Sequence, residues 1–523
     1  SGWVDAWTTE PSAYAVAAGD AGDVAAAIDF AREHAVRLVV KGGGHSYQGT
    51  SCAPDSLLVW TRRMNRITVH DEFVARGCEG SQPPQPAVSI GAGALWMDVY
   101  DAVTTKGGRY VQGGGCTTVG VAGLIQSGGF GSFSKAYGLA AAGLLEAEVV
   151  TADGEVRIAN PCSHPELYWG LKGGGGGSLG IVTRLTLRTH ELPATFGGAF
   201  GRIRATSDRA YRALIARVVD LYRERLFNPH WGEQIVFEGG DTVRIAMVFQ
   251  GLNEEEATSA WRPFVDHVAA RPDDYVVEQP LGFLVAPARR LWDAAFLEQY
   301  APGLAVPDDR PDATPGHFSW ASNQGEVGQF LHGYRSAWLP ADLLETDRRP
   351  ELVDALFAAA RQWTVSLHFN KGLAGAPADV ISSARDTAMN PAVLDAFALA
   401  IIAGEGRPAF PDIAGHEPDL AAARREARQI DLAMDELMEV APEAGSYVAE
   451  SDYFEENWQR SFWGSNYPRL AAVKREYDPD GLFFVHHGVG SEEWSADGFT
   501  RVGSHGLRNG QSPAGSLRAR AGE

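Results

Sequence analysis

The spacing of apolar and polar positions near the start of the chain predicts a helix followed by a strand. Asp20 stands where a helix N-cap would be, ahead of Val24 and Ile28 on one helical face. The run Arg37-Leu38-Val39-Val40 is typical of a short buried strand. It leads directly into a glycine-rich loop at residues 41–46. This order predicts a helix–strand–loop unit whose loop presents bare backbone N–H groups.

Short elements separated by glycine clusters are expected up to about residue 193. The pattern predicts a strand at residues 88–90, a helix at 95–106, a hairpin of strands 148–150 and 156–158, and a strand at 181–187. The hairpin turn is Ala152-Asp153-Gly154, a sequence that favours tight turns.

Longer helical patterns replace the glycine clusters after this point. Helices are predicted at residues 208–225, 254–269 and 419–440, and strand-like runs at 361–370 and 393–403. The proline-rich stretch 302–315 indicates a surface excursion, and residues 466–484 indicate a helix followed by a short strand. We therefore expect a glycine-rich α+β half, a larger α/β half, and a C-terminal segment that returns to the first half.

Composition limits the class of protein. The chain has 523 residues, of which 45% are hydrophobic, enough for two or three globular domains of roughly 150 residues each. No apolar run reaches the roughly 18 residues of a membrane span, and the longest, at residues 396–403, fits a buried strand or helix. The net charge of −21 disfavours nucleic acid and membrane partners and, weakly, polyanionic substrates. The start at Ser1 without an apolar signal core leaves the compartment open, and the oligomeric state is also open.

Four glycine clusters within the first 180 residues suggest a cofactor site. They are Gly42-Gly43-Gly44, Gly113-Gly114-Gly115, Gly128-Gly129 and the run 173–177. This density suits a cofactor with an extended pyrophosphate, which backbone N–H groups can cradle. The clusters match neither a Rossmann nor a Walker A motif. Residues 176–180 match the G-x-S-x-G hydrolase elbow, but a strand follows where that elbow needs a helix, so hydrolysis is disfavoured.

His45 and Cys116 each follow a glycine triplet. Taken singly, such a histidine is more often a hydrogen-bonded loop residue and such a cysteine a buried thiol. Their shared setting favours another interpretation, because glycines let backbone and side chain approach a planar ligand closely. The four cysteines form no CxxC pair and no zinc spacing, and no HExxH motif occurs, so no metal site is expected.

These motifs resemble those of the berberine bridge enzyme-like family. The resemblance rests on Gly42-Gly43-Gly44-His45-Ser46, on Gly115-Cys116-Thr117-Thr118-Val119-Gly120, and on the C-terminal run at residues 467–480. The family consists of FAD-linked oxidoreductases of the vanillyl-alcohol oxidase / p-cresol methylhydroxylase superfamily. The match extends over residues 10–190 and 445–495, approximately, and is weak between them.

The resemblance implies one FAD held by two covalent bonds, from His45 to the flavin 8α-methyl group and from Cys116 to ring carbon 6. Two tethers at one edge imply an open cleft for a bulky substrate. With Cys116 bonded to flavin, at most one disulfide can form, and Cys52 with Cys78 is one possible pair. The residues expected to bind the cofactor are Gly42, Gly43, Gly44, His45, Ser46, Gly115, Cys116, Thr117, Val119, Gly120, Gly128, Gly129, Ile181 and Asn466.

The implied fold class is α+β, with a two-domain vanillyl-alcohol-oxidase-like architecture. An FAD-binding domain is expected at residues 1–195 and a substrate-binding domain at 196–455, whose antiparallel sheet lies over the flavin. Residues 456–500 are expected to return to the FAD domain. Residues 501–523 are expected to form a disordered tail.

Two residues are expected to direct the chemistry. The resemblance places Val119 near the flavin carbon that reacts with oxygen, and a small valine there is associated with oxidases, although simple packing would also explain it. Residues 446–452 resemble a family strand on the substrate side of the flavin, where many members use a tyrosine as proton acceptor. This chain has Glu450 at that position, which predicts a carboxylate as general base. The alternative is a solvated acidic strand edge, since Glu455 and Glu456 are close by.

Tyr447, His368, Asn370 and His487 are expected to line the substrate pocket, with purely structural roles as the alternative. The expected partners are a small-molecule substrate and O2. The expected reaction transfers hydride from the carbinol carbon of an alcohol or sugar to flavin N5 while Glu450 takes the hydroxyl proton, and O2 then yields H2O2. Three alternatives remain: a dehydrogenase with another electron acceptor, an oxidative tailoring enzyme, and a flavin-binding protein without turnover.

Overall fold

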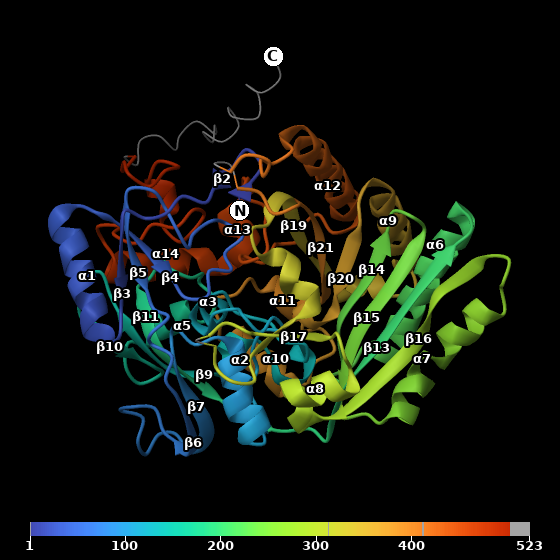
Figure 1. The fold of residues 1–523 in the computed structure, drawn as a ribbon, viewed down its shortest axis with the longest axis horizontal. Helices are drawn as coiled ribbons and strands as arrows, with labels where there is room; N and C mark the ends of the chain where they lie inside the picture. Colours follow the sequence, from blue (N-terminus) through green and yellow to red (C-terminus); the bar gives the residue numbers. More distant parts are fainter. Residues whose placement is uncertain (1, 312, 411–412, 503–523) are drawn as a thin grey trace.

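The computed structural model describes residues 2–311, 313–410 and 413–502. Two parts lie side by side, one containing helix α1 (Ala21–His34) and the other a broad sheet backed by helices (Figure 1). The C-terminal helices α13 (Trp458–Trp463) and α14 (Tyr467–Tyr477), in red, lie with the first part (Figure 1). The segment between residues 195 and 455 thus separates two stretches of sequence that share one part of the molecule.

Helix α1 begins at the predicted cap. The Asp20 carboxylate accepts hydrogen bonds from the backbone N–H groups of Gly22 at 2.8 Å and Asp23 at 3.1 Å. This satisfies two of the N–H groups that a helix start leaves without partners. Val24 and Ile28 then point into a core that they share with strand β5 (Ser56–Trp60). The prediction of this unit is confirmed.

Two sheets build the first part. The parallel sheet has the order β3 (Tyr14–Ala17), β5, β4 (Arg37–Lys41). The antiparallel sheet has the order β10 (Val156–Ala159), β9 (Leu144–Val150), β11 (Ile181–Arg188), β7 (Gln85–Gly91), β6 (Ile67–Phe73). The predicted strands and the 148–158 hairpin are therefore confirmed. The predicted 95–106 helix is α2 (Trp96–Tyr100), which continues as a π-helix, η1 (Asp101–Lys106).

A nine-stranded sheet forms most of the second part. Its order is β16 (Tyr275–Pro287), β13 (Thr195–Ala205), β15 (Thr242–Gln250), β14 (Trp231–Glu238), β20 (Val365–His368), β21 (Ala396–Gly406), β19 (Phe330–Pro340), β1 (Gly2–Trp3) and β2 (Trp7–Thr8). Its strand pairs are antiparallel apart from the β1–β19 pair. The first strands of the chain therefore pair within this sheet, although the sequence assigned residues 1–195 to the FAD domain.

Helices cover one face of the large sheet. They are α6 (Asp208–Leu221), α7 (Glu254–Ala269), α9 (Arg349–Gln362) and α12 (Leu420–Val440), on the outer side in Figure 1. Tyr211, Trp261, Leu356 and Leu437 are buried in the core between helices and sheet. Each such side chain stabilises the fold by roughly 1.5–3 kcal/mol relative to exposure. This burial leaves the opposite sheet face free to form a site wall.

The C-terminal segment is held in the first part by apolar and ionic contacts. Leu470 and Val473 of α14 share a core with Leu167 of α5 (Pro165–Leu171). The buried Lys474 ammonium group lies 2.6 Å from Asp478 and donates to the backbone carbonyl of Ser178 at 2.7 Å. Helix α14 thus buttresses the glycine run at residues 173–180. The domain boundaries themselves remain a prediction.

Several local expectations were wrong. Residues 361–370 are the end of α9, the short strand β20 and a 3₁₀ turn, because α9 extends to Gln362. The 393–403 run starts inside helix α11 (Ala392–Asp395) before β21 begins. The described residues after α14 contain no strand, since the Asp478 carboxylate accepts from the backbone N–H groups of Leu482 and Phe483 and turns the chain.

The disulfide also differs from the pair considered from sequence. Cys78 is bonded to Cys162, 84 residues later, while Cys52 is a free thiol. The two partners lie in loops that a linear pattern could not bring together. Of the predicted tail 501–523, only residues 501 and 502 belong to the described part of the chain.

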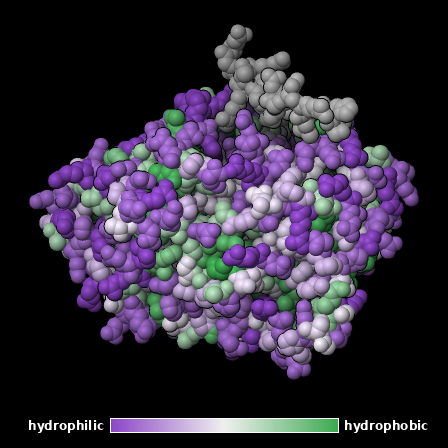
Figure 2. Space-filling view, turned by 180° about the vertical axis from the view of Figure 1, so that it is seen from behind, coloured by the Kyte–Doolittle hydropathy of each residue, from purple (hydrophilic) through white to green (hydrophobic). Residues whose placement is uncertain are grey.

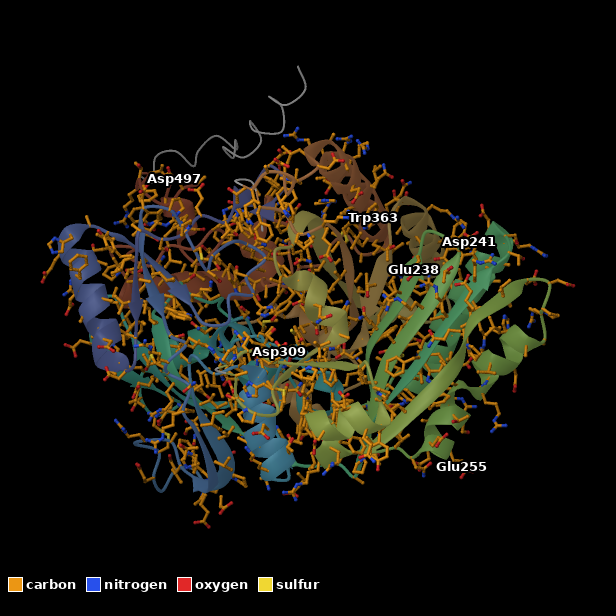
Figure 3. All side chains as sticks on the ribbon, viewed as in Figure 1. Glu238, Asp241, Glu255, Asp309, Trp363 and Asp497 are labelled. Carbon is orange, nitrogen blue, oxygen red and sulfur yellow. A yellow bond between two sulfur atoms is a disulfide. The ribbon has the colours of Figure 1, made fainter. Side chains whose placement is uncertain are left out.

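The surface is largely hydrophilic, with small scattered apolar groups on the face shown in Figure 2. Some acidic side chains are paired with arginines, as at the outer end of the β14–β15 hairpin, where Glu238 lies 2.7 Å from Arg202 and Asp241 pairs with Arg361 (Figure 3). No helix among the described residues is long and apolar enough to cross a bilayer. Part of the acidic surface is therefore neutralised by ion pairs with arginine.

Candidate functional site

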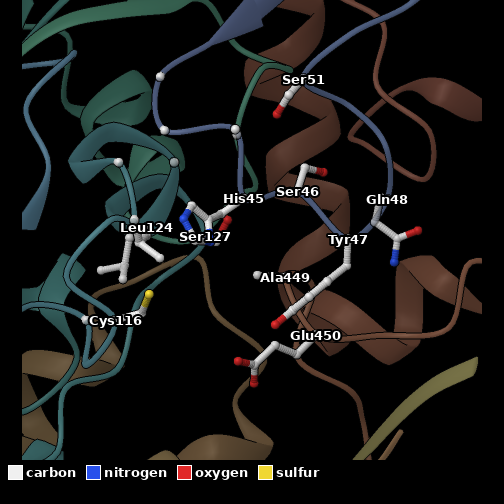
Figure 4. A pocket seen from close by; sticks show the side chains of 18 of the residues that line it. His45, Ser46, Tyr47, Gln48, Ser51, Cys116, Leu124, Ser127, Ala449 and Glu450 are labelled. Atoms are coloured by element: carbon white, nitrogen blue, oxygen red, sulfur yellow. The ribbon is translucent and has the colours of Figure 1, made fainter. Parts of the chain in front are cut away.

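A cavity of about 1230 Å³ lies between the glycine loops and the uncovered face of the large sheet. It is lined by loop residues near 42–54, 114–133 and 175–182, by strands β13 and β14, and by the C-terminal stretches 447–453 and 483–488. Figure 4 shows His45 and Cys116 on one side and Glu450 with Tyr47 on another. Ligand sites commonly occur in such clefts between two structural layers.

Two glycine loops touch each other at the cavity wall. A Cβ atom on Gly43 would lie 2.5 Å from the backbone nitrogen of Gly120, and one on Gly120 would lie 2.6 Å from that of Gly43. Such contacts against backbone leave no room for a side chain. These glycines are therefore needed for the contact between the loops, as well as for any approach to a ligand.

This contact brings His45 and Cys116 together. His45 Nε2 lies 2.9 Å from the Thr118 hydroxyl, and Cys116 Sγ lies 3.4 Å from the same oxygen. Burial lowers the pKa of His45, so the imidazole is neutral and has a free nitrogen lone pair. Burial raises the pKa of the Cys116 thiol, and the nearby Glu326 carboxylate raises it further. A nucleophilic nitrogen and a thiol thus lie side by side.

Glu326 joins this pair and was not singled out by the sequence. Its Oε2 lies 3.5 Å from His45 Nδ1 and 3.9 Å from Cys116 Sγ. Ligand atoms of the three residues fall within 4.8 Å of one another, a separation that also suits metal ligands. Glycine clusters marked the loops of His45 and Cys116, whereas no comparable pattern surrounds Glu326.

The cavity wall has the donor and acceptor groups that a large polar cofactor requires. Among the described residues, several buried polar atoms without a hydrogen-bond partner belong to side chains that line it. They are Gln48 Oε1, Gln126 Oε1, Ser178 Oγ, His368 Nδ1, Asn370 Oδ1 and His487 Nδ1. Because burying such atoms without partners is costly, a polar ligand in this cavity is expected. Together with the glycine loops and the two nucleophiles, they fit FAD.

Glu450 lines the cavity in an ion pair. Both of its carboxylate oxygens lie 2.6 Å from the ammonium group of Lys371, and the side chains are only 18% and 13% exposed, respectively. The backbone of residues 447–450 is a tight turn, not the strand that the resemblance suggested, because the Glu450 N–H donates to the Tyr447 carbonyl at 2.8 Å. The turn places the carboxylate inside the site and rules out a solvated acidic strand edge.

The cavity contains another carboxyl group, Glu233, that the sequence did not indicate. Glu233 lies two residues after the buried Trp231 of β14, so regular strand alternation would direct both side chains toward the helices. Glu233 nevertheless lines the cavity. Its φ of +63° lies in the left-handed region and redirects the side chain. The Ser132 hydroxyl donates to its carboxylate, and burial raises its pKa. A charged residue at a core-facing strand position was the signal that could have found it.

Most expected cofactor residues line the cavity: Gly42, Gly43, Gly44, His45, Ser46, Gly115, Cys116, Val119, Gly120 and Ile181. Four others do not line it, and their role toward the cofactor stays a prediction. The Thr117 hydroxyl donates to the Phe318 carbonyl, and the Asn466 amide donates to the Met389 carbonyl, so both have structural partners. Gly128 and Gly129 pack against Met389 and Leu124 below the wall.

All four expected substrate residues line the cavity. The Asn370 amide donates to the Gly131 carbonyl at 3.1 Å, and the Tyr447 hydroxyl accepts from the Gly129 N–H at 3.3 Å. Burial lowers the pKa of His368, and it lowers that of His487 to about 2, so both imidazoles are neutral. His487 stacks on His486 with ring centres 3.9 Å apart.

Comparison with known proteins supports this interpretation of the cavity. Residues 12–160 match the family described as FAD binding domain, and residues 446–490 match the family described as Berberine and berberine like. The VAO-type flavoprotein oxidase VAO615 of Thermothelomyces thermophilus is 30% identical over 496 residues, which cover 94% of this chain and 78% of that protein.

Solved structures share the fold. The crystal structure of the VAO-type flavoprotein MtVAO615 from Myceliophthora thermophila C1 superposes with a TM-score of 0.74 at 26% identity, covering 93% of this chain and 82% of that one. Glucooligosaccharide oxidase from Acremonium strictum, with its 6-S-cysteinyl, 8α-N1-histidyl FAD, superposes with a TM-score of 0.67 at 19% identity, covering 92% of each chain. The expected α+β fold of this superfamily is thereby confirmed.

The relationship extends over almost the whole chain, and it includes the FAD binding domain and the C-terminal segment that encloses the cavity. The protein is an enzyme of the flavin-dependent class. The chain belongs to the berberine bridge enzyme-like FAD-linked oxidoreductases of the vanillyl-alcohol oxidase superfamily.

Proposed function

We propose that the protein is an oxidase that takes hydride from a CH–OH group of an alcohol or sugar, passes the electrons to O2 to form H2O2, and holds FAD through His45 and Cys116. The observation that carries the proposal is the adjacency of a neutral imidazole and a thiol around Thr118, with the Glu450 carboxylate in the same cavity. Glucooligosaccharide oxidase, which shares the fold, supports both the double attachment and a sugar-type substrate.

When bound, FAD supplies the hydride acceptor and then the electrons for O2. His45 and Cys116 would hold the FAD from one side of the cavity, and the opposite side would then stay open to a substrate. Val119 is half-buried in the wall beside them and has little bulk to block O2. The chain's remaining task is to orient the substrate and to accept its hydroxyl proton.

Glu450 is proposed as the proton acceptor. Lys371 orients its carboxylate, since one ammonium group contacts both oxygens. Substrate hydroxyl groups would meet the polar atoms Asn370 Oδ1 and His368 Nδ1, which lack partners within the described chain. Neutral histidines suit this role, because they can accept or donate a hydrogen bond without adding charge.

Acid precipitation followed by peptide mass mapping tests the attachment. We expect a yellow pellet and a peptide pair, containing residues 45 and 116, joined through one flavin. A colourless pellet with all the pigment in the supernatant would overturn the double attachment. His45→Ala and Cys116→Ala variants serve as matched controls, each expected to retain one link.

An anaerobic substrate screen tests the reaction. An alcohol or sugar that is a substrate should bleach the oxidised flavin absorbance, and air should restore it with formation of H2O2. Slow reoxidation in air would instead favour a dehydrogenase. A new C–C or C–O bond in the product would favour a tailoring enzyme, and absence of bleaching by every compound would favour a flavin-binding protein without turnover.

A further inference from the structure

Glu326 is held against the Cys116 loop by the hairpin that precedes it. Strand β18 (Phe318–Trp320) pairs with β17 (Ala305–Pro307), within the segment expected as a surface excursion. The Thr117 hydroxyl donates to the Phe318 carbonyl, and the Trp320 indole N–H donates to the Gly115 carbonyl, both at 2.9 Å. These two bonds flank Cys116 in sequence. The position of the 3₁₀ turn η5 (Ala321–Glu326) is therefore tied to the thiol.

The Glu326 carboxylate is also oriented. The Asn323 amide donates to Oε1 at 2.7 Å, which leaves Oε2 directed at Cys116 Sγ and His45 Nδ1. Among the described residues, no lysine or arginine forms an ion pair with Glu326. The side chain is 28% exposed, and burial raises its pKa. The free oxygen of this carboxylate can therefore accept a proton from a neighbouring group.

Attachment of the cysteine needs such an acceptor. The thiolate, not the thiol, is the nucleophile, and burial keeps Cys116 protonated. Thr118 does not solve the problem, because a hydroxyl group is a poor base. His45 needs less help, since its lowered pKa already leaves a neutral nitrogen. The two expected links therefore differ in their requirement for a base.

We propose that Glu326 is the general base that deprotonates Cys116 when its sulfur bonds to FAD, an inference that rests on the proposed double attachment. The Sγ–H proton passes to Glu326 Oε2 as the bond from Sγ to the flavin ring carbon forms. The hydrogen on that carbon leaves as a proton, and the electron pair reduces the ring. Dioxygen removes this pair, which restores oxidised flavin and yields H2O2.

The test follows each link separately in Glu326→Gln. Protein is purified early in expression and then incubated at pH 7.0 and pH 9.5, and the flavin on the peptides with residues 45 and 116 is measured by mass spectrometry. We expect the histidine link to form normally and the cysteine link to form about 100-fold more slowly at pH 7.0, in line with the loss of a general base. At pH 9.5 the cysteine link should recover, because solvent then generates the thiolate.

Glu405→Gln is the matched control. Glu405 is an exposed carboxyl group whose pKa is raised by desolvation and further by the charge of Glu326. Among the described residues no hydrogen bond or ion pair joins it to Cys116. Both links should form at the wild-type rate in this variant. Other titratable groups that face Cys116 or Glu326 are His45, Tyr47, Tyr100, Tyr334 and Glu405. All of them are retained in Glu326→Gln, and all but Glu405 are retained in the control.

The outcomes separate the two proposals. If the wild-type protein lacks the cysteine link, the double attachment fails and this inference fails with it. If wild type and Glu326→Gln form the cysteine link equally fast at pH 7.0, only the role of Glu326 is overturned. A slow link that pH 9.5 does not rescue would also overturn that role, since it would indicate misplacement of Cys116. If Glu326→Gln retains no flavin, Asn323→Ala replaces it, with the same slowing expected and a wild-type rate as the contrary result.

Discussion

At the scale of single residues, the site depends on how each polar group is paired. Glu450 has a lysine partner, Glu233 has neutral partners, and Glu326 faces an imidazole and a thiol. Three carboxyl groups in one cavity can therefore take different roles, because each has different hydrogen-bond and charge partners. Sequence alone indicated only one of them.

Glu450→Gln tests the proposed proton acceptor. Glutamine preserves size and can still accept a hydrogen bond from Lys371, but it cannot take a proton from a substrate hydroxyl. We expect anaerobic flavin reduction to slow by about 10²–10⁴-fold, while the flavin stays attached. Stopped-flow absorbance measures this rate, and a variant that reduces as quickly as wild type would remove Glu450 from the mechanism.

Glu233→Gln tests the buried carboxyl group by its effect on stability. Its raised pKa means that the folded protein keeps a proton which the unfolded chain loses, so wild-type stability falls as pH rises from about 4.5 through the raised folded value. The melting temperature of Glu233→Gln, relative to wild type, should therefore increase between pH 4.5 and 7.5. Glu255→Gln, on the exposed first turn of α7 (Figure 3), is the control. If the difference in melting temperature between the variant and wild type did not change with pH, the raised pKa of Glu233 would be contradicted.

At the scale of elements, loops and helix ends bring the chemistry together. The Gly43–Gly120 contact joins the two nucleophile loops, and the β17–β18 hairpin adds Glu326. Helix α14 supports the 173–180 glycine run from the far end of the chain through Lys474. The resemblance recognised α14 as a returning segment, but its ionic anchor became visible only in three dimensions.

Lys474→Met tests that anchor. The change leaves the Asp478 carboxylate, whose side chain is 0% exposed, without its cation, and an unpaired buried charge is expected to cost about 3–5 kcal/mol. The free energy of unfolding, from denaturant titration followed by tryptophan fluorescence, measures the loss. Arg475→Met, one residue along and exposed, should change it by less than about 0.5 kcal/mol. Equal small effects in both variants would show that α14 does not depend on this ion pair.

At the scale of the whole molecule, the cavity exists because two parts meet. Lys135 of helix α4 (Ser134–Tyr137) links them: its buried ammonium group donates to the carbonyls of Gly372 at 2.5 Å and Phe397 at 3.0 Å. Gly372 and Phe397 belong to the part with the large sheet, whereas α4 follows the glycine clusters. Burial without a carboxylate partner lowers the pKa of Lys135 to about 7.

Lys135→Met tests this link through the pH dependence of stability. The pKa of Lys135 is about 7 in the folded protein and 10.5 in the unfolded chain, so between these pH values the amine is protonated mainly in the unfolded chain. The free energy of unfolding of the wild type therefore increases as pH rises through this window. The wild-type melting temperature should therefore rise relative to Lys135→Met between pH 7 and 9.5. Lys106→Met, at an exposed site, is the control. If the difference in melting temperature between wild type and Lys135→Met stayed constant from pH 7 to 9.5, the lowered pKa of Lys135 would be contradicted.

The sequence by itself determined the local elements and the glycine loops that line the cavity. Capping by Asp20, the 148–158 hairpin and the glycine triplets before His45 and Cys116 are encoded by neighbouring residues, so short-range patterns predicted them. Tertiary structure decided which side chains meet: the Cys78–Cys162 bond, the Lys371–Glu450 pair and the approach of Glu326 to Cys116 join residues 79 to 210 positions apart. Such contacts depend on the packing of whole sheets against loops, which no local pattern of hydrophobicity or charge specifies.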